Sequence, residues 1–238
     1  MQAWDLALTG VPVVAAGAAG VAATVRRPGV RLTSGLQHFA AGVVIAAAAL
    51  ELLPEVVRQS GFVSVAGFGL GIVVMFAMRA VTTRLEQRAG VQSDALPAGL
   101  IGATGVDFLI DGVILGAGFT AGGHTGILLS IALAIEYVFV SLSLAGAMGE
   151  ATSRSLVVAV PVALSVLTVG GAVLGAWVLA GVSTTVLAGV LAFGAVAFMY
   201  LATEELLVEA HAQGETAVGS TAFYVGFLVV LVMEQALR

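Results

Sequence analysis

The sequence predicts an all-α polytopic membrane protein, and three properties of its composition lead to that prediction. Hydrophobic residues make up 60% of the 238 residues, and the mean hydropathy is +1.11. Only 10% of the residues are charged, whereas a soluble domain usually carries about 25%. Glycine is frequent, at 31 residues, which in membranes favours close helix packing. The chain contains no cysteine, which excludes disulfide bonds and thiolate metal sites.

Eight stretches are long and apolar enough to cross a bilayer as helices, since a crossing needs roughly 20 such residues. We expect them at residues 6–25, 36–56, 62–82, 97–120, 126–148, 156–180, 184–208 and 217–237. The connections between them are short, so we interpret residues 1–238 as a single transmembrane domain without a soluble domain.

The placement of arginine predicts the orientation, because basic residues concentrate in cytoplasmic connections. On the side opposite to the cytoplasm, the predicted connections and termini would hold only Arg58 and Arg238. The first, third and fifth connections and their flanks hold Arg26, Arg27, Arg31, Arg79, Arg84, Arg88 and Arg154. We therefore expect a multi-pass protein of the cell (inner or plasma) membrane with both termini outside the cytoplasm. Nothing in this charge pattern suggests a nucleic-acid partner.

Three acidic residues stand in the middle of two consecutive apolar stretches. Asp107 and Asp111 are four residues apart in 97–120, and Glu136 lies in the centre of 126–148. At 1.5 Å per residue, Asp107 and Glu136 each lie about 15 Å along their helices, near the middle of a ~30 Å hydrocarbon core. A carboxylate at that depth costs several kcal/mol unless it is paired, hydrated or bound to a metal. A divalent cation between the three acids would remove both their repulsion and this cost.

The donor atoms restrict the ion only in part. Oxygen ligands suit Mg²⁺, Ca²⁺, Mn²⁺ or Fe²⁺ better than soft ions. Zinc usually recruits His or Cys, although carboxylates also bind it. Mn, Fe, Zn, Cd, Co and Mg therefore all stay open as the substrate ion. In a second interpretation one or more of the acids are protonated, or bond to Ser, Thr or backbone groups inside the bundle, for which Thr104, Ser141 and Ser143 are candidates.

Other acidic residues lie nearer to the helix ends. Glu204 and Glu205, at the predicted inner end of 184–208, form either an exit route or an ordinary helix-end charge, as do the neighbouring Glu209 and His211. Glu51 precedes Pro54 near the predicted outer end of 36–56, and is a candidate for an entrance position. We interpret His38 as a packed or interfacial histidine, and Glu234, near the C-terminus, as structural.

Three segments resemble the ZIP (Zrt/Irt-like) family of metal transporters. HFAAGVVIAAAALELLPE is similar to the F-A-A-G…L-L-P-E segment of the family's second helix, and DFLIDGVILG to the H-N-x-x-E/D-G-x-x-x-G of its fourth. AFGAVAFMYLATEELLVEAH resembles the small-residue run ending in E-E-L-x-x-E of its seventh helix. The resemblance implies a 3+2+3 arrangement of the eight helices, in which helices 1, 4, 5 and 6 move against the rest.

The resemblance also assigns roles to individual residues. Asp107 stands where the family has the first ligand of helix 4, a His, and Asp111 stands at its helix-4 acid. Glu136 matches the acid of the family's helix-5 motif H-E-x-P-E-G. Glu204 and Glu205 match the pair assigned to the exit route. The chain departs from the family's motifs at Phe108, Ile135, Val138, Phe139 and Val140. It also lacks the internal prolines of the family's helices 4 and 5. One all-oxygen site therefore remains, and the family's second metal position is degraded.

These observations favour a divalent-metal transporter that works by alternating access, with the lipid bilayer and the cation as its partners. The alternative is a ZIP-like carrier of a non-metal or proton-coupled solute. An intramembrane aspartyl protease would need two Asp on different helices, whereas Asp107 and Asp111 share one helix. We therefore expect no enzyme, and no cofactor. A structural or regulatory subunit is the remaining class. The glycine-rich segments GAAGVAA and GGAVLGAW would permit a homodimer or serve packing inside one chain.

Overall fold

The computed structural model describes residues 3–25, 29–59, 61–89, 98–148, 152–212 and 217–237. These residues form helices without any strand, which confirms the all-α prediction. Eight helical spans are long and apolar enough to cross a membrane, as predicted. They are Trp4–Val25, Leu32–Arg58, Phe62–Arg84, Gly99–Ala121, Gly123–Ala147, Arg154–Val178, Thr184–Ala212 and Gly219–Leu237.

Five of the spans come from single uninterrupted helices. These are α5 (Phe62–Ala89), α6 (Ala98–Ala121), α7 (Gly123–Ala147), α8 (Arg154–Val178) and α11 (Ala217–Leu237). The first span is divided into α1 (Ala3–Thr9) and α2 (Val11–Val25). The break falls at Gly10, just before Pro12, which has no backbone N–H to continue the hydrogen bonding of α1.

The second and seventh spans each contain a short π-helical segment that the sequence analysis did not anticipate. The second span consists of α3 (Val30–Ala47), η1 (Ala48–Leu52) and α4 (Leu53–Arg58). The seventh consists of α9 (Thr184–Tyr200), η2 (Leu201–Leu206) and α10 (Leu207–Ala212). At the end of each segment a backbone N–H donates to a carbonyl five residues back: Leu53 to Ala48, and Leu207 to Ala202. Such segments occur frequently at functional sites, and these two carry Glu51 in η1 and the predicted exit pair in η2.

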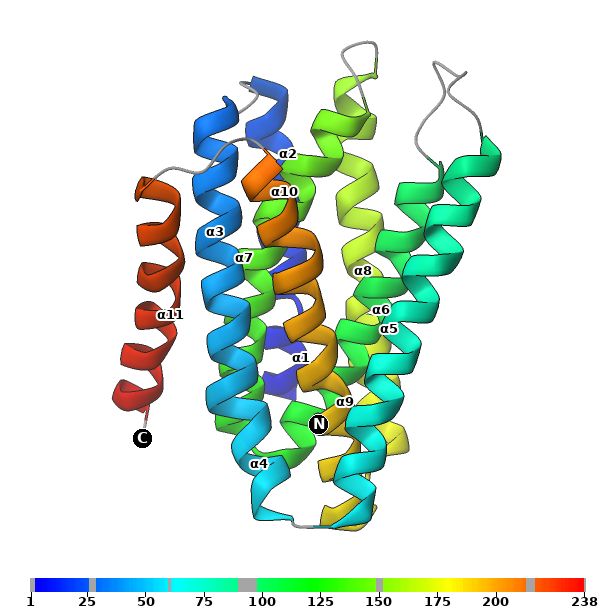
Figure 1. Ribbon diagram of the computed structural model, residues 1–238, viewed down its shortest axis with the longest axis vertical. Coiled ribbons are helices and arrows are strands. Elements are labelled where there is room, and N and C mark those ends of the chain that lie inside the picture. The colour runs from blue at the N-terminus through cyan, green and yellow to red at the C-terminus, as the bar shows by residue number, and fades with distance from the viewer. Residues whose placement is uncertain are drawn as a thin grey trace.

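The helices pack as two groups (Figure 1). In the first, α6 packs against α8 and α7, and α2 packs against α7 and α8. In the second, α3 packs against α11, α5 against α9, and η2 and α10 against α3. The main contacts between the groups are those of α7 with α3 and of α6 with α9. This division separates spans 1, 4, 5 and 6 from spans 2, 3, 7 and 8; the 3+2+3 arrangement itself stays a prediction.

Glycine allows α6 and α8 to approach closely. A Cβ at Gly112 would clash with the carbonyl of Thr168, and a Cβ at Gly175 would lie 2.7 Å from the carbonyl of Val113. Gly20, in α2, lies against the backbone of Val158 in α8. Gly20 and Gly175 of the segments GAAGVAA and GGAVLGAW therefore serve packing inside one chain, whereas a Cβ at the exposed Gly170 would meet nothing within 4 Å. A homodimer stays a prediction.

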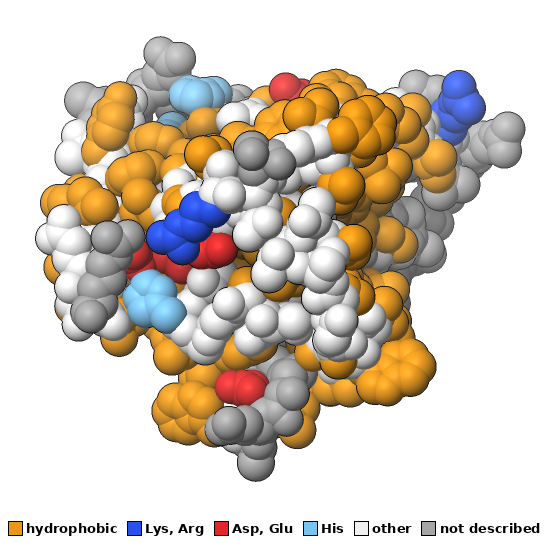
Figure 2. All heavy atoms as spheres, turned by 90° about the horizontal axis from the view of Figure 1, so that it is seen from below, with side chains coloured by type: hydrophobic (Ala, Val, Ile, Leu, Met, Phe, Trp, Pro, Cys, Tyr) orange, Lys and Arg blue, Asp and Glu red, His pale blue; other side chains and the backbone are white. Residues whose placement is uncertain are grey.

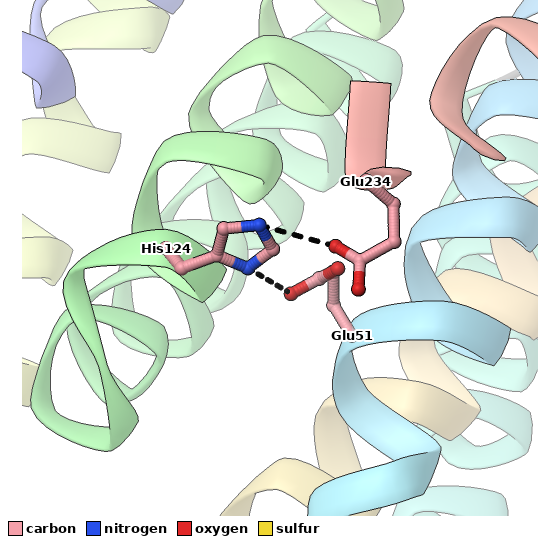
Figure 3. A group of neighbouring side chains, drawn as sticks. All are labelled: Glu51, His124 and Glu234. Carbon is pink, nitrogen blue, oxygen red and sulfur yellow. Dashed lines mark ion pairs between the residues drawn. The ribbon is translucent and has the colours of Figure 1, made fainter. Parts of the chain in front are cut away.

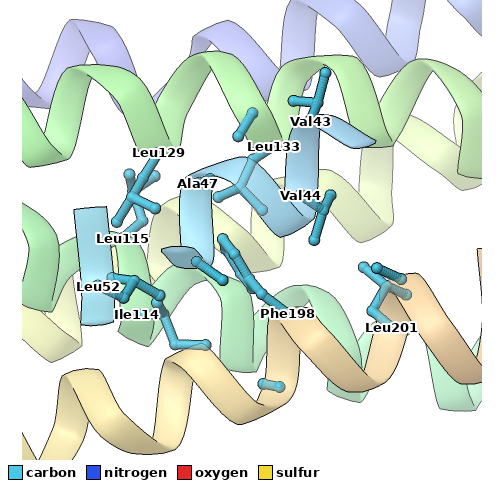
Figure 4. Close-up of a cluster of buried hydrophobic side chains, with 14 of the residues drawn as sticks. Val43, Val44, Ala47, Leu52, Ile114, Leu115, Leu129, Leu133, Phe198 and Leu201 are labelled. Carbon is cyan, nitrogen blue, oxygen red and sulfur yellow. The ribbon is translucent and has the colours of Figure 1, made fainter. Parts of the chain in front are cut away.

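The core between the groups contains a layer of large apolar side chains (Figure 4). Leu115 of α6, Leu129 and Leu133 of α7, Leu52 of η1 and Phe198 of α9 are all at most 1% exposed. The N- and C-termini both lie toward the end of the bundle at which α4 is found, as an even number of crossings requires (Figure 1). The side of the membrane on which the termini lie stays a prediction. Among the arginines on which it depends, Arg26, Arg27 and Arg238 lie outside the described residues.

Candidate cation site

The structure brings Asp107, Asp111 and Glu136 together inside the first helix group. Asp107 and Asp111 lie one turn apart on α6, and Glu136 lies on the adjacent α7, which runs in the opposite direction. One carboxylate oxygen from each residue lies within 4.8 Å of the other two. The four-residue spacing on α6 and the similar depth of the acids in the two helices therefore bring the three carboxylates together, as the sequence predicts.

Glu136 is the acid of this cluster whose charge is least stabilised by its surroundings. Its side chain is 0% exposed, and neither carboxylate oxygen has a hydrogen-bond partner within the described part of the chain. Asp111 is 2% exposed, whereas Asp107 is only partly buried. Three carboxylates at such short range repel one another when ionised, and burial adds a desolvation cost for each charge. The cluster therefore has a high capacity to take up positive charge, either as protons or as a metal cation.

Tyr137 holds Asp111 in place. Its hydroxyl group donates to Asp111 Oδ2 at 3.2 Å and lies 2.6 Å from Thr168 Oγ1 of α8. The tyrosine ring stacks on Phe108, with the ring centroids 3.7 Å apart. The hydroxyl partner of the cluster is thus a tyrosine, and not one of the Ser or Thr residues suggested above. Ser141 has no hydrogen-bond partner in the described chain, and Ser143 bonds to Glu209 Oε1 at 3.4 Å.

A cavity of about 280 Å³ leads to the cluster from one end of the bundle. Asp107 is the member of the cluster that lines it. Farther out, its walls include Thr83 near the end of α5, Leu100 at the start of α6 and Glu209 of α10. The cavity therefore opens at the end where α5 and α6 are connected, opposite to α4 and the chain termini. In the predicted orientation, this end is the cytoplasmic one.

Both predicted exit residues line this cavity. Glu204 accepts a hydrogen bond from Arg79 Nη1 of α5 at 2.5 Å, and the two side chains form an ion pair. Glu205 lies beside it in η2, on the wall that faces Asp107. Arg79 was counted in the sequence analysis only for orientation, although it lies within the third span. Its position inside the cavity adds a positive charge to the route between the cluster and the bundle end.

The candidate entrance residue, Glu51, lies in a different cluster. It is 4% exposed, in η1, and faces His124 at the start of α7, which also faces Glu234 near the end of α11. His124 was not among the predicted site residues, because it stands in a predicted connection, and Glu234 was expected to be structural. A usable signal was present: both acids lie within apolar helices, and His124 is one of only three histidines in the chain.

The comparisons with known proteins found no relative of this chain among family models or curated proteins. The structure therefore supports a membrane protein with eight apolar helices and a buried carboxylate cluster, and membership of the ZIP family stays a proposal.

Proposed function

We propose that this protein is a membrane transporter that carries a divalent metal cation through the cluster of Asp107, Asp111 and Glu136. The observation that carries the proposal is Glu136: a fully buried carboxylate without a hydrogen-bond partner in the described chain, with two more carboxylates within 4.8 Å. Three buried carboxylates so close together lower the stability of the fold, so stability does not explain their presence. Acidic residues at membrane depth mark ion and proton pathways. A hard or borderline cation of the class Mn²⁺, Fe²⁺, Zn²⁺, Cd²⁺, Co²⁺ or Mg²⁺ would neutralise it.

The access to the cluster supports transport rather than permanent metal binding. The cavity reaches Asp107 from one end of the bundle, while buried leucines and Phe198 fill the core on the opposite side. A carrier that is open to one side only must change conformation to release its cargo on the other. We propose that the group formed by α2, α6, α7 and α8 moves as a body against the other helices. Glu204, Glu205 and Arg79 then form the route at the cavity end.

The resemblance to ZIP transporters supports the same proposal, with a site that does not specifically favour zinc. In this interpretation the chain is a divergent member in which carboxylates replace the family's histidine ligands. The three motifs in spans 2, 4 and 7 support this, and so does the division of the helices into the two groups that the family's motion requires.

One observation favours a second function, that of a carrier for a non-metal or proton-coupled solute. The cavity at Asp107 has a volume of about 280 Å³, close to the lower end of the roughly 300–1,000 Å³ usual for small-molecule pockets, and far more than one ion fills. Its wall offers both the arginine and the glutamates of the predicted exit route. In this function the three central acids would exchange protons or bind an amine.

Uptake into proteoliposomes distinguishes these functions. The wild-type protein and the triple variant Asp107→Ala/Asp111→Ala/Glu136→Ala would be compared for Mn²⁺, Fe²⁺, Zn²⁺, Cd²⁺, Co²⁺ and Mg²⁺. Glu55→Gln is the matched control, because it removes an acid that forms only an exposed ion pair with Arg58 in α4. We expect the flux of at least one ion in wild type and Glu55→Gln, and none in the triple variant.

Three results would count against this proposal. Wild-type protein that is folded but moves none of the ions would support the solute carrier, as would a solute flux insensitive to chelators. Equal metal flux in wild type and triple variant would place the route elsewhere in the bundle.

A further inference from the structure

A second group of potential metal ligands lies near the end of the bundle opposite to the cavity (Figure 3). The imidazole of His124 stands between two carboxylates: Nδ1 is 3.6 Å from Glu51 Oε2, and Nε2 is 3.2 Å from Glu234 Oε2. One ligand atom from each of the three residues lies within 4.8 Å of the other two. The three side chains thus converge at one point, although 183 positions separate the first from the last in the sequence (234 − 51).

Each ligand is held by a different element. Glu51 comes from η1, where the π-helical turn before Pro54 changes the direction of its side chain relative to a continuous α-helix. His124 is the second residue of α7, and Glu234 lies in the last turn of α11. The glutamate side chains are 3% and 7% exposed, whereas that of His124 is 34% exposed, so solvent reaches the group along the histidine. Seen from this end of the molecule, acidic, histidine and arginine side chains gather at one place on the surface (Figure 2).

We propose that Glu51, His124 and Glu234 bind a divalent first-row transition metal, in a site separate from the central cluster. Two carboxylates and one imidazole form a donor set that suits Zn²⁺, Co²⁺, Mn²⁺ and Fe²⁺, because imidazole nitrogen favours these ions over Mg²⁺ and Ca²⁺. Three protein ligands with one exposed edge also leave a coordination position for water. The site differs chemically from the oxygen-only central cluster, and it stands whether or not the central cluster transports a metal.

The position of this site connects the two helix groups. His124 belongs to α7 of the first group, whereas Glu51 and Glu234 belong to α3–α4 and α11 of the second. A bound metal therefore links the groups at the end opposite to the cavity. It favours the conformation in which this end is closed, because separation of the groups would break the coordination.

Cobalt binding tests the site directly. The full chain would be purified in detergent as the variant Asp107→Asn/Asp111→Asn/Glu136→Gln, which removes the charges of the central cluster, and titrated with Co²⁺. We expect one bound Co²⁺ per chain, with visible d–d absorption that Zn²⁺ abolishes by displacement. Adding His124→Asn removes the binding. Glu234→Gln weakens it at least about tenfold, as expected when even an outer partner of a metal site is lost.

His211→Asn provides the matched control. His211 is an exposed histidine whose ring contacts His38 at the cavity end, with the ring centroids 5.1 Å apart, and its loss must leave Co²⁺ binding unchanged. If the central variant does not fold, the same pair of histidine variants is compared in the wild-type chain, where His124→Asn must bind one Co²⁺ fewer than His211→Asn. Equal Co²⁺ binding by the two histidine variants, or no binding at all by folded protein, overturns the proposal and leaves His124 as an ion-pair contact.

Discussion

The two ligand clusters of this protein have the same size but different construction. In both, three side chains bring ligand atoms within 4.8 Å of one another. The central cluster uses carboxylates only, from two helices that are adjacent in the sequence and belong to one packing group. The cluster of Glu51, His124 and Glu234 includes an imidazole and joins elements of both groups. In the proposed mechanism, a site inside one moving group travels with its cargo, whereas a site across both groups holds them together.

The layer between the clusters separates their surroundings. Leu129 and Leu133 lie on α7 between His124 and Glu136, and Leu115 lies one turn beyond Asp111 on α6. All three leucines are 0% exposed, and their side chains offer no polar group to a dehydrated cation. The cavity reaches the central cluster from one end of the bundle, and the cluster of Glu51, His124 and Glu234 lies toward the other end, with this apolar layer between them.

The largest expected effect comes from a single change in the central cluster. Glu136→Gln keeps the shape of the side chain but removes its charge, so we expect cation flux to fall at least about a hundredfold, or ~2.8 kcal/mol at 1.4 kcal/mol per factor of ten. The apo protein should melt at an unchanged or higher temperature, because a buried carboxylate is replaced by a neutral group. Flux and thermal melting are measured beside Glu55→Gln. Retained flux, or a lower melting temperature that explains its loss, would contradict a cargo-binding role for Glu136.

Accessibility of single cysteines gives the next largest difference, and the chain is suited to it because it contains no native cysteine. Ala103→Cys lies in the cavity wall and should react with a membrane-impermeant thiol reagent from the cytoplasmic side only. Leu133→Cys lies in the apolar layer and should stay unreactive from both sides. Ser183→Cys, in the exposed connection between α8 and α9, should react from the opposite side. Labelling of Ala103→Cys and Ser183→Cys from the same side would contradict the cavity's proposed sidedness.

The two clusters also differ in how far the sequence predicts them. The central cluster follows from local rules: the spacing of Asp107 and Asp111, the depth of Glu136 and the antiparallel course of consecutive helices are all readable from the chain. His124 and Glu234 are brought together by the packing of α11 against α3 and α7, which no local pattern specifies. The eight spans were predictable from hydrophobicity alone. The π-helical segments were not, because η2 contains no proline or glycine to signal a break in the helix.

A clash between α6 and α8 should disturb the central cluster and leave the other intact. Gly112 follows Asp111, and a Cβ there meets the carbonyl of Thr168, so we expect Gly112→Ala to destabilise the protein by about 1–3 kcal/mol. Gly102→Ala on the same helix, where a Cβ meets nothing within 4 Å, is the control and should not be destabilising. Thermal melting in detergent measures both variants. Equal stability of the two would show that α6 and α8 are not packed as closely as described.

The smallest expected effect concerns the orientation of Asp111. Tyr137→Phe removes the hydroxyl that donates to Asp111 at 3.2 Å but keeps the ring stacked on Phe108. A hydrogen bond of this kind contributes about 0.5–1.5 kcal/mol, so we expect the cation concentration at half-maximal flux to rise roughly two- to tenfold, with less change in the maximal rate. Co²⁺ binding at the cluster of Glu51, His124 and Glu234 should not change, because Tyr137 makes no hydrogen bond to it. An equal weakening of both sites would mean that Tyr137 supports the bundle as a whole, whereas a selective effect assigns it to the positioning of one cation ligand.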